Sequence, residues 1–293
     1  MTLLILAGGM GSRYGGEKQY DDIGPCGEFL LEYNIYDAIQ VGFQEIVIVT
    51  NEASKDAIYD YLRSRIPAKI KLSCVAQLIS DVPIEVSSIS REKPWGTAHA
   101  VWSARKVING TFVTLNADDL YGREGLADAM TLCKKIGSNE STYGIVTYHL
   151  EQTISKHGSV SRGVCEVANE SLMNVVEHTK IRFKNKQLID EASGILLERD
   201  SLASMNLWVL QPSIFEEIEK SLLTNLVHMK AQGSELYLPN VIQQLIDYGD
   251  HEVLNQTTQS EWVGMTYKED RKSIMETLVK LSKKGVYPSP LWK

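Results

Sequence analysis

A loop rich in glycine and carrying two cations lies close to the start of the chain. It reads AGGMGSRYGGEK, overlaps the end of the apolar run Leu3–Ala7, and contains Arg13 and Lys18. Glycines let backbone N–H groups approach an anion closely, because no Cβ stands in the way. Arginine binds a phosphate through its planar fork and lysine through a point charge. We therefore predict a phosphate-binding loop rather than a turn with two solvated cations.

Neither of the two common phosphate-binding motifs fits this loop. A dinucleotide motif that starts at Gly9 would need its third glycine where Tyr14 stands. A P-loop that starts at Gly11 would need lysine directly after Gly16, but Glu17 intervenes. Other segments of the chain must therefore decide which phosphate ligand the loop binds.

A second candidate segment, LNADDLYG, ends an apolar strand in carboxylates. Asp118 emerges where the strand ends, and such a carboxylate is well placed to hold Mg²⁺ beside a triphosphate. We predict Asp118 as the metal ligand, with Asp119 as the substitute. The alternative is that the two acids cap the helix that follows, because aspartate is a favoured N-cap residue. This segment alone leaves both interpretations open.

The segment KPWGTAHAV reads as a tight turn that opens a helix. Gly96 permits a close backbone approach to a ligand, and Thr97 could cap the helix. His99 falls on the face of the helix that we expect to be buried, so we interpret it as a core histidine with its hydrogen bonds satisfied. The remaining histidines are dispersed and suggest no Ser/His/Asp triad.

The bulk composition excludes several classes of partner. Charged residues make up 23% of the 293 residues, and the net charge is −7, with no basic tract. Nucleic acid and anionic membranes are therefore poor partners. The four cysteines are widely spaced, which suits free thiols in a reducing compartment. No apolar stretch approaches the roughly 20 residues of a membrane helix, so we expect a soluble, cytoplasmic protein.

Strand-like and helix-like segments alternate through the first half of the chain, which predicts βαβ units and parallel strands. From residue 143 to 189 short strands dominate, which suggests an antiparallel or mixed extension. We predict an α/β fold, a single three-layer Rossmann-like domain over residues 1–293 with a mainly parallel mixed sheet. Residues 1–140 form its nucleotide-binding half and residues 141–293 its second-substrate half. Ligands collect where parallel strands end, which puts residues 8–18 and 116–119 on one edge.

Taken together, these segments resemble the sugar-1-phosphate nucleotidyltransferases, the NDP-sugar pyrophosphorylases. The family signature LAxGxGxR with a lysine a few residues later is matched by Leu6, Ala7, Gly8, Gly9, Gly11, Ser12, Arg13 and Lys18. GTAHAV from Gly96 and NADDLYG from Asn116 follow in the family's order and spacing. VVEHTK around Glu177, SMNLWVL around Asn206 and the later WVGMTYKED extend the match over nearly the whole chain.

The resemblance implies a role for each of these residues. Arg13 and Lys18 would bind the triphosphate and the departing pyrophosphate, and Asp118 would hold Mg²⁺. The remaining nucleotide contacts would come from Leu6, Ala7, Gly8, Gly9, Gly11, Ser12, Gly96, Thr97 and Asn116. The second substrate would be met by Gly163, Glu177 and Asn206. Its phosphate is mostly dianionic at neutral pH and needs no general base, which agrees with the absence of a triad.

The chain departs from the family pattern at three places. Glu17 precedes Lys18 where the family usually has proline. Gln77 lies farther before Gly96 than the glutamine with which many members read the base. Gly264 stands where many members offer a second metal-binding acid or asparagine.

These departures leave several alternatives open. The preferred partners are a nucleoside triphosphate and a sugar 1-phosphate. Phosphocholine or a polyol phosphate could replace the sugar phosphate, and a non-catalytic nucleotide-binding regulator would keep the fold without turnover. Assembly into a homo-oligomer also stays open.

Overall fold

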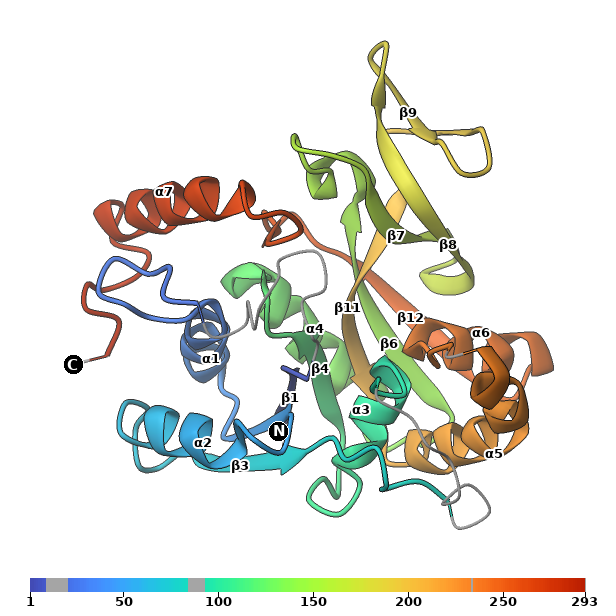
Figure 1. Ribbon diagram of the computed structural model, residues 1–293, viewed down its shortest axis with the longest axis horizontal. Helices are drawn as coiled ribbons and strands as arrows, with labels where there is room; N and C mark the ends of the chain where they lie inside the picture. Colours follow the sequence, from blue (N-terminus) through green and yellow to red (C-terminus); the bar gives the residue numbers. More distant parts are fainter. Residues whose placement is uncertain (9–20, 84–92, 233, 293) are drawn as a thin grey trace.

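The computed structural model describes residues 1–8, 21–83, 93–232 and 234–292, and it forms a central sheet with helices on both faces (Figure 1). The loop residues Gly9, Gly11, Ser12, Arg13 and Lys18 lie outside the described part of the chain. No helix among the described residues has both the length and the apolar character needed to cross a bilayer.

The strands follow the predicted order along the chain. They are β1 (Thr2–Leu6), β2 (Glu45–Thr50), β3 (Lys71–Ala76), β4 (Phe112–Asn116), β5 (Asp119–Leu120), β6 (Thr142–His149), β7 (Val160–Ala168), β8 (Ser171–Lys184), β9 (Gln187–Asp190), β10 (Ile195–Leu197), β11 (Leu202–Leu210), β12 (Glu252–Thr257) and β13 (Val263–Gly264).

The helices also fall where the sequence pattern predicts them. They are α1 (Leu30–Val41), α2 (Lys55–Arg63), α3 (Thr97–Ser103), α4 (Gly122–Ile136), the short 3₁₀ helix η3 (Leu150–Thr153), α5 (Ile214–Gln232), α6 (Leu238–Tyr248) and α7 (Asp270–Lys283). Gly285, with φ +74°, follows the end of α7 in the left-handed conformation. α5 begins at Ile214, two residues after Pro212.

Alternation along the buried strands produces the three layers. In β1, Leu3 and Ile5 pack in the core that contains α1, α2 and α4 residues, whereas Leu4 and Leu6 pack in the core that contains α3, α5 and α6 residues. Successive side chains of a strand point to opposite faces, so a run that is apolar throughout is buried on both sides. The predicted α/β fold with helices on both faces is confirmed.

The sheet has order β10-β9-β8-β12-β6-β11-β4-β1-β2-β3, with β7 paired to β8 and β11. The neighbours β4, β1, β2 and β3 run parallel, as the first half of the sequence predicts. β11 is antiparallel to β4 and β6, and β7, β8, β9 and β10 form an antiparallel extension. In Figure 1 this extension reaches away from the helical layers, with β9 near its tip.

The segment after α7 returns to helix α1 and covers its buried acids. The Tyr287 hydroxyl donates to Asp37 Oδ2 at 2.5 Å, and the Trp292 indole N–H donates to Glu32 Oε2 at 2.7 Å. Both carboxylates are fully buried. Burial raises the pKa of Glu32 and of Asp37, although the hydrogen-bond donors around them act in the opposite direction.

Candidate functional site

The edge where β1, β3 and β4 end, here called the strand-end rim, continues the parallel pairing beyond the strands. Ala7 N donates to Val49 O at 2.7 Å, and Gln77 N donates to Thr50 O at 2.7 Å. These bonds carry the chain directly into Gly8 and Gln77. A Cβ on Gly8 would lie only 2.7 Å from Gln77 Oε1, so the amide of Gln77 lies against this glycine.

Gln77 is held in one orientation by two acceptors. Its Nε2 donates to Gly96 O at 3.1 Å and lies 3.2 Å from His99 Nδ1. His99 Nε2 lies 2.7 Å from Asp81 O, which can only accept, so the ring proton belongs on Nε2 and Nδ1 accepts from Gln77. Both amide hydrogens of Gln77 are used in these bonds, and its Oε1 lies beside Gly8. The prediction that His99 is a satisfied core histidine is confirmed.

Gly96 makes the close approach that the sequence predicts, first of all to protein. Its φ is +102°, and a Cβ there would lie 2.5 Å from Leu236 O. Leu236 N donates to Trp95 O at 2.8 Å, which ties the segment before α6 to this turn. The Thr97 hydroxyl accepts from Leu238 N at 3.0 Å. Thr97 therefore caps α6, and the expectation that it caps its own helix is wrong, because Gly96 occupies that N-cap position.

The acid segment lies beside the end of β1. Leu6 pairs with Asn116 in the parallel register, and Ala117 N donates to Leu6 O at 3.0 Å. Asn116 Nδ2 donates to Asp119 Oδ2 at 3.0 Å, so the amide fixes the second carboxylate. Asp118 is half-buried and Asp119 is buried. The alternative that this pair caps the next helix is wrong, because the N-cap of α4 is Tyr121 and no side chain caps it.

Tyr121 connects the acid segment to β11, and the sequence analysis missed it. Its hydroxyl donates to Met205 O at 2.6 Å and accepts from Asn116 N at 3.1 Å. Asn206 follows with a left-handed φ of +61°, at the register shift in β11. Its Oδ1 accepts from Trp208 Nε1 at 3.3 Å. Tyr121 thus anchors the strand irregularity that carries Asn206 to the acids. Its place two residues after Asp119 was the available signal.

The end of β13 packs against the same acids. Gly264 pairs with Asp119, and Met265 N donates to Asp118 O at 3.2 Å. A Cβ on Gly264 would collide with Asp119 Oδ1 and with Trp262 Cζ2. No side chain fits at position 264 while Asp119 and Trp262 keep these positions. The departure from the family pattern therefore has a steric cause, and the second carboxylate of this corner is that of Asp119.

These acids suit a magnesium ion that is completed by substrate. Within the described residues, no group of three or more His, Cys, Asp or Glu side chains is arranged to hold a metal. Mg²⁺ usually binds through one or two carboxylates, several waters and substrate phosphates. Asp118 and Asp119 supply such a donor set, so the residues present fit the ion.

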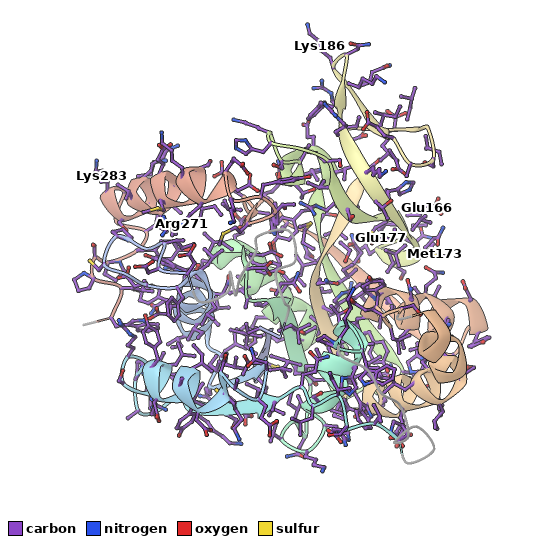
Figure 2. All side chains as sticks on the ribbon, viewed as in Figure 1. Glu166, Met173, Glu177, Lys186, Arg271 and Lys283 are labelled. Atoms are coloured by element: carbon purple, nitrogen blue, oxygen red, sulfur yellow. The ribbon has the colours of Figure 1, made fainter. Side chains whose placement is uncertain are left out.

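Two of the predicted second-substrate residues, Gly163 and Glu177, lie on the β7–β8 hairpin, and the third, Asn206, lies on β11. Gly163 pairs with both Glu177 and Ser204, and a Cβ on Gly163 would lie 3.6 Å from Glu177 Oε2. Figure 2 shows Glu177 near the inner end of β8, far from Lys186 at the outer tip. Glu177 is exposed, yet desolvation by the protein around its carboxylate raises its pKa. The charges of Arg162 and His178 oppose this change.

Charges on the hairpin act on groups beside the strand-end rim. Tyr237 precedes α6 beside the Gly96 turn; burial raises its pKa, and the charges of Glu235 and Glu177 add to this change. Arg162, next to Gly163, interacts electrostatically with Asp119 and Glu177. The structure therefore gathers the described members of both predicted groups into one region. Gln77, which the sequence analysis weighed but left unassigned, belongs to the same region.

The profile of the family described as "Nucleotidyl transferase" matches residues 2–265. The chain belongs to this family. As a nucleotidyltransferase it is 27% identical over 225 residues to a UTP–glucose-1-phosphate uridylyltransferase of Bacillus subtilis, covering 73% of this chain and 68% of the relative. A Haemophilus influenzae protein of the same name is 23% identical over 248 residues, 79% of this chain and 76% of the relative.

Solved structures share the fold of this nucleotidyltransferase. The inositol-1-phosphate CTP transferase from T. maritima aligns with a TM-score of 0.65 at 13% identity, covering 96% of each chain. A UDP-glucose pyrophosphorylase from Acinetobacter aligns with a TM-score of 0.62 at 16% identity, covering 94% of this chain and 91% of the other.

Proposed function

We propose that this nucleotidyltransferase condenses a nucleoside triphosphate with a sugar 1-phosphate to give an NDP-sugar and pyrophosphate, with Mg²⁺. The observation that carries the proposal is the convergence of three groups. Gly8, Gln77 and Gly96 form the strand-end rim, Asp118 and Asp119 follow beside it, and the β7–β8 hairpin comes next. Uridylyl transfer to glucose 1-phosphate, as in the named relatives, supports UTP and a hexose phosphate.

The strand-end rim is proposed to bind the base. Gly8 and Gly96 lack a Cβ, so Gln77 and Leu236 pack directly against their backbone and fix the shape of this surface. Gln77 contributes its Oε1, because both hydrogens of its amide are engaged with Gly96 O and His99. An acceptor at this point suits the N3–H of uracil or thymine, whereas the N3 of cytosine is itself an acceptor. Leu6, Ala7, Thr97 and Asn116 support this surface.

The acids and the loop cations are proposed to align and neutralise the phosphates. Asp118, with help from Asp119, would hold Mg²⁺, which would supply positive charge to stabilise the phosphates. Arg13 and Lys18, with the backbone of Gly9, Gly11 and Ser12, are proposed to bind the β- and γ-phosphates. Charge neutralisation and alignment are the main means of catalysing phosphoryl and nucleotidyl transfer.

The hairpin is proposed to hold the sugar phosphate. Glu177 accepts hydrogen bonds from sugar hydroxyls beside Gly163, and Asn206 offers its amide. An oxygen of the sugar phosphate attacks the α-phosphorus, and the bond from that phosphorus to the bridging oxygen of the β-phosphate breaks. The electron pair leaves with pyrophosphate. The attacking phosphate is already largely dianionic, so the chain needs no general base.

We also infer that residues 1–140 and 141–293 act as the two halves of one domain.

The cysteines of the chain are widely spaced and form no disulfide among the described residues, which suits the reducing cytoplasm.

The experiment that tests the function is a grid of pyrophosphate release with Mg²⁺. It crosses UTP, dTTP, CTP, GTP and ATP with sugar 1-phosphates, a polyol phosphate and phosphocholine. Lys18→Ala runs beside the wild type as the inactive control. We expect release with UTP or dTTP and a sugar 1-phosphate. Release only with CTP and a different phosphomonoester would replace the substrate assignment. No pyrophosphate release in any combination, together with tight triphosphate binding, would indicate a regulator.

A further inference from the structure

Asn34 is a fully buried amide on helix α1 that reaches across to the acid segment. Its Nδ2 donates to Asp119 O at 2.6 Å, and its Oδ1 accepts from Tyr121 N at 3.2 Å. Both bonds go to backbone groups, which lie 85 and 87 residues away along the chain. Asn34 therefore holds the main chain of the acid segment rather than a side chain of it.

The amide takes the place of a neighbouring strand. The N–H and C=O of one strand residue point to the same edge, and those of the next residue point to the other edge. Asp119 O and Tyr121 N therefore share one edge of β5. The opposite edge faces β13, beside which Met265 N donates to Asp118 O at 3.2 Å. One side-chain amide thus bonds to β5 as the peptide group of a third strand would.

The shortness of β5 makes this third partner important. β5 and β13 contain two residues each and form a sheet of their own, apart from the central sheet. A pair of strands is only marginally stable by itself. Removal of the amide would take one partner from a buried carbonyl and one from a buried N–H, at about 1–3 kcal/mol for each group left unsatisfied. The segment would then shift, and the carboxylates of Asp118 and Asp119 would move with it.

Helix α1 presents the amide from a fixed support. One helical turn after Asn34, Asp37 accepts a hydrogen bond from the hydroxyl of Tyr287 in the C-terminal segment. Before Asn34, Leu30 packs in one apolar cluster with Leu120 of β5. Since the helix is held by contacts of its own, Asn34 sets the place of the acid segment rather than following it.

We propose that Asn34 is a positioning residue that sets the affinity of the acid pair for Mg²⁺. The inference rests on the proposed function, in which Asp118, with help from Asp119, would hold the ion. Asn34 acts through the backbone of β5 and not by contact with the ion or a substrate. Mg²⁺ demands near-ideal octahedral geometry, whereas Ca²⁺ accepts flexible coordination. A shift of the two carboxylates therefore weakens the site for Mg²⁺ more than for Ca²⁺.

The test measures by calorimetry how much Mg²⁺ strengthens triphosphate binding in the absence of the second substrate. The Kd values for UTP and for CTP are determined with EDTA, with Mg²⁺ and with Ca²⁺. Wild type is compared with Asn34→Leu, which keeps the branched shape and loses both hydrogen-bonding atoms. We expect the gain in affinity from Mg²⁺ to fall at least about tenfold, since a misplacement of about 1 Å can cost about 10²-fold. The gain from Ca²⁺ should fall less, and the Kd with EDTA should stay within about twofold.

Gln211→Met is the matched control. Gln211 is also a buried amide with two bonds, because its Nε2 donates to Gly137 O at 3.0 Å and its Oε1 accepts from Thr111 Oγ1 at 2.9 Å. It directly follows β11, whose last residue pairs with the first residue of β4, at the opposite edge of the sheet from the acids. Denaturant unfolding should show comparable losses of stability in Gln211→Met and Asn34→Leu. The gain from Mg²⁺ should stay at the wild-type value in Gln211→Met.

Asn34→Ser leaves room for a water and is the milder variant if Asn34→Leu does not fold; it should shift the gain from Mg²⁺ in the same direction. An unchanged gain in a folded Asn34 variant overturns the proposal, and so does a loss no larger than that of Gln211→Met. A wild type whose binding of UTP and CTP gains nothing from Mg²⁺ overturns it too. Pyrophosphate release in the substrate grid tests the proposed function separately, so the two failures are distinguishable.

Discussion

The strand-end rim and the β7–β8 hairpin, which we propose to share one site, are built in opposite ways. The rim follows β1, β3 and β4; the side chains of β1 and β4 are almost entirely buried, and Gln77 at the end of β3 is held by Gly96 and His99. The hairpin exposes large apolar side chains, among them Met173 at 53% and Val176 at 44% (Figure 2). The rim is held by the core of the sheet, whereas the hairpin reaches out from it.

This difference has a thermodynamic meaning. Side chains locked by burial and hydrogen bonds keep one geometry, while regions with few buried contacts open more easily. The rim is proposed to bind the base, and a fixed geometry suits the recognition of one base. The second substrate differs between members with this fold, and the more exposed hairpin is where such variation is tolerated.

The largest effect is expected at the acids between the two regions. Asp118→Asn should lower kcat by at least about 10²–10³-fold, because a charge that faces the transition state is removed. Steady-state pyrophosphate release measures this change. Asp60→Asn, on the exposed face of α2, is the control and should retain wild-type kcat. Near-normal turnover of Asp118→Asn would remove Asp118 from its assigned role.

A glycine pair tests how tightly the rim is built. Gly96 and Gly42 have similar φ values of +102° and +110°, but a Cβ would meet Leu236 at Gly96 and nothing within 4 Å at Gly42. Alanine at either position should cost about 1–3 kcal/mol of backbone strain. Gly96→Ala should cost more than Gly42→Ala and should also raise the KM for the triphosphate.

Denaturant unfolding of both glycine variants gives the comparison directly. Equal losses of unfolding free energy would mean that the contact with Leu236 adjusts without cost. The rim would then be softer than its packing indicates.

On the hairpin the expected effect is smaller and selective. Glu177→Ala should raise the KM for the sugar 1-phosphate by roughly tenfold, the value of one hydrogen bond to a charged group. The KM for the triphosphate should not change. Glu166→Ala is the matched control, because Glu166 lies on the same hairpin and contacts Asn174 instead. An equal rise in both KM values would place Glu177 outside the sugar site.

The smallest effect is a pH dependence of stability that comes from Glu32 in helix α1. Glu32 is buried and its folded pKa is raised above the ordinary 4.5, so the folded state holds this proton more tightly than the unfolded chain. Its contribution to stability therefore falls as pH rises from about 4.5 through the raised pKa. Thermal unfolding across this pH range should show that the stability of Glu32→Gln rises relative to that of the wild type as the pH increases. The expected change is about 1.4 kcal/mol for each pH unit that separates the folded and unfolded pKa values of Glu32.

Glu170 on the exposed turn of the β7–β8 hairpin is the control for this measurement. Its ion pair with Lys135 lowers its pKa, so the sign for Glu170→Gln is opposite, and solvent screening keeps the effect small. A difference between wild type and Glu32→Gln that does not vary with pH would mean that the donors around Glu32 cancel the effect of its burial.

The sequence by itself determined the elements and one edge of the site. The apolar run of β1 and the acid-ended β4 are local patterns, and parallel strands end at a common edge, so Leu6 and Asn116 were expected on one edge. Their direct pairing depends on the strand order, which the structure shows. Glycine content and positive φ are also local, which is why Gly96 could be singled out. Family membership followed from the order of these segments.

Only the tertiary structure decided the partners of individual side chains. Gln77 reaches Gly96 across 19 residues, and Thr97 caps a helix 141 residues away. Asp119 faces Gly264, and the guanidinium of Arg162 donates to the carbonyls of Thr153 and Ser161. Local propensity sets φ, ψ and periodicity, but a hydrogen bond or a steric contact depends on which distant segment arrives beside a residue, and that is settled only when the layers pack.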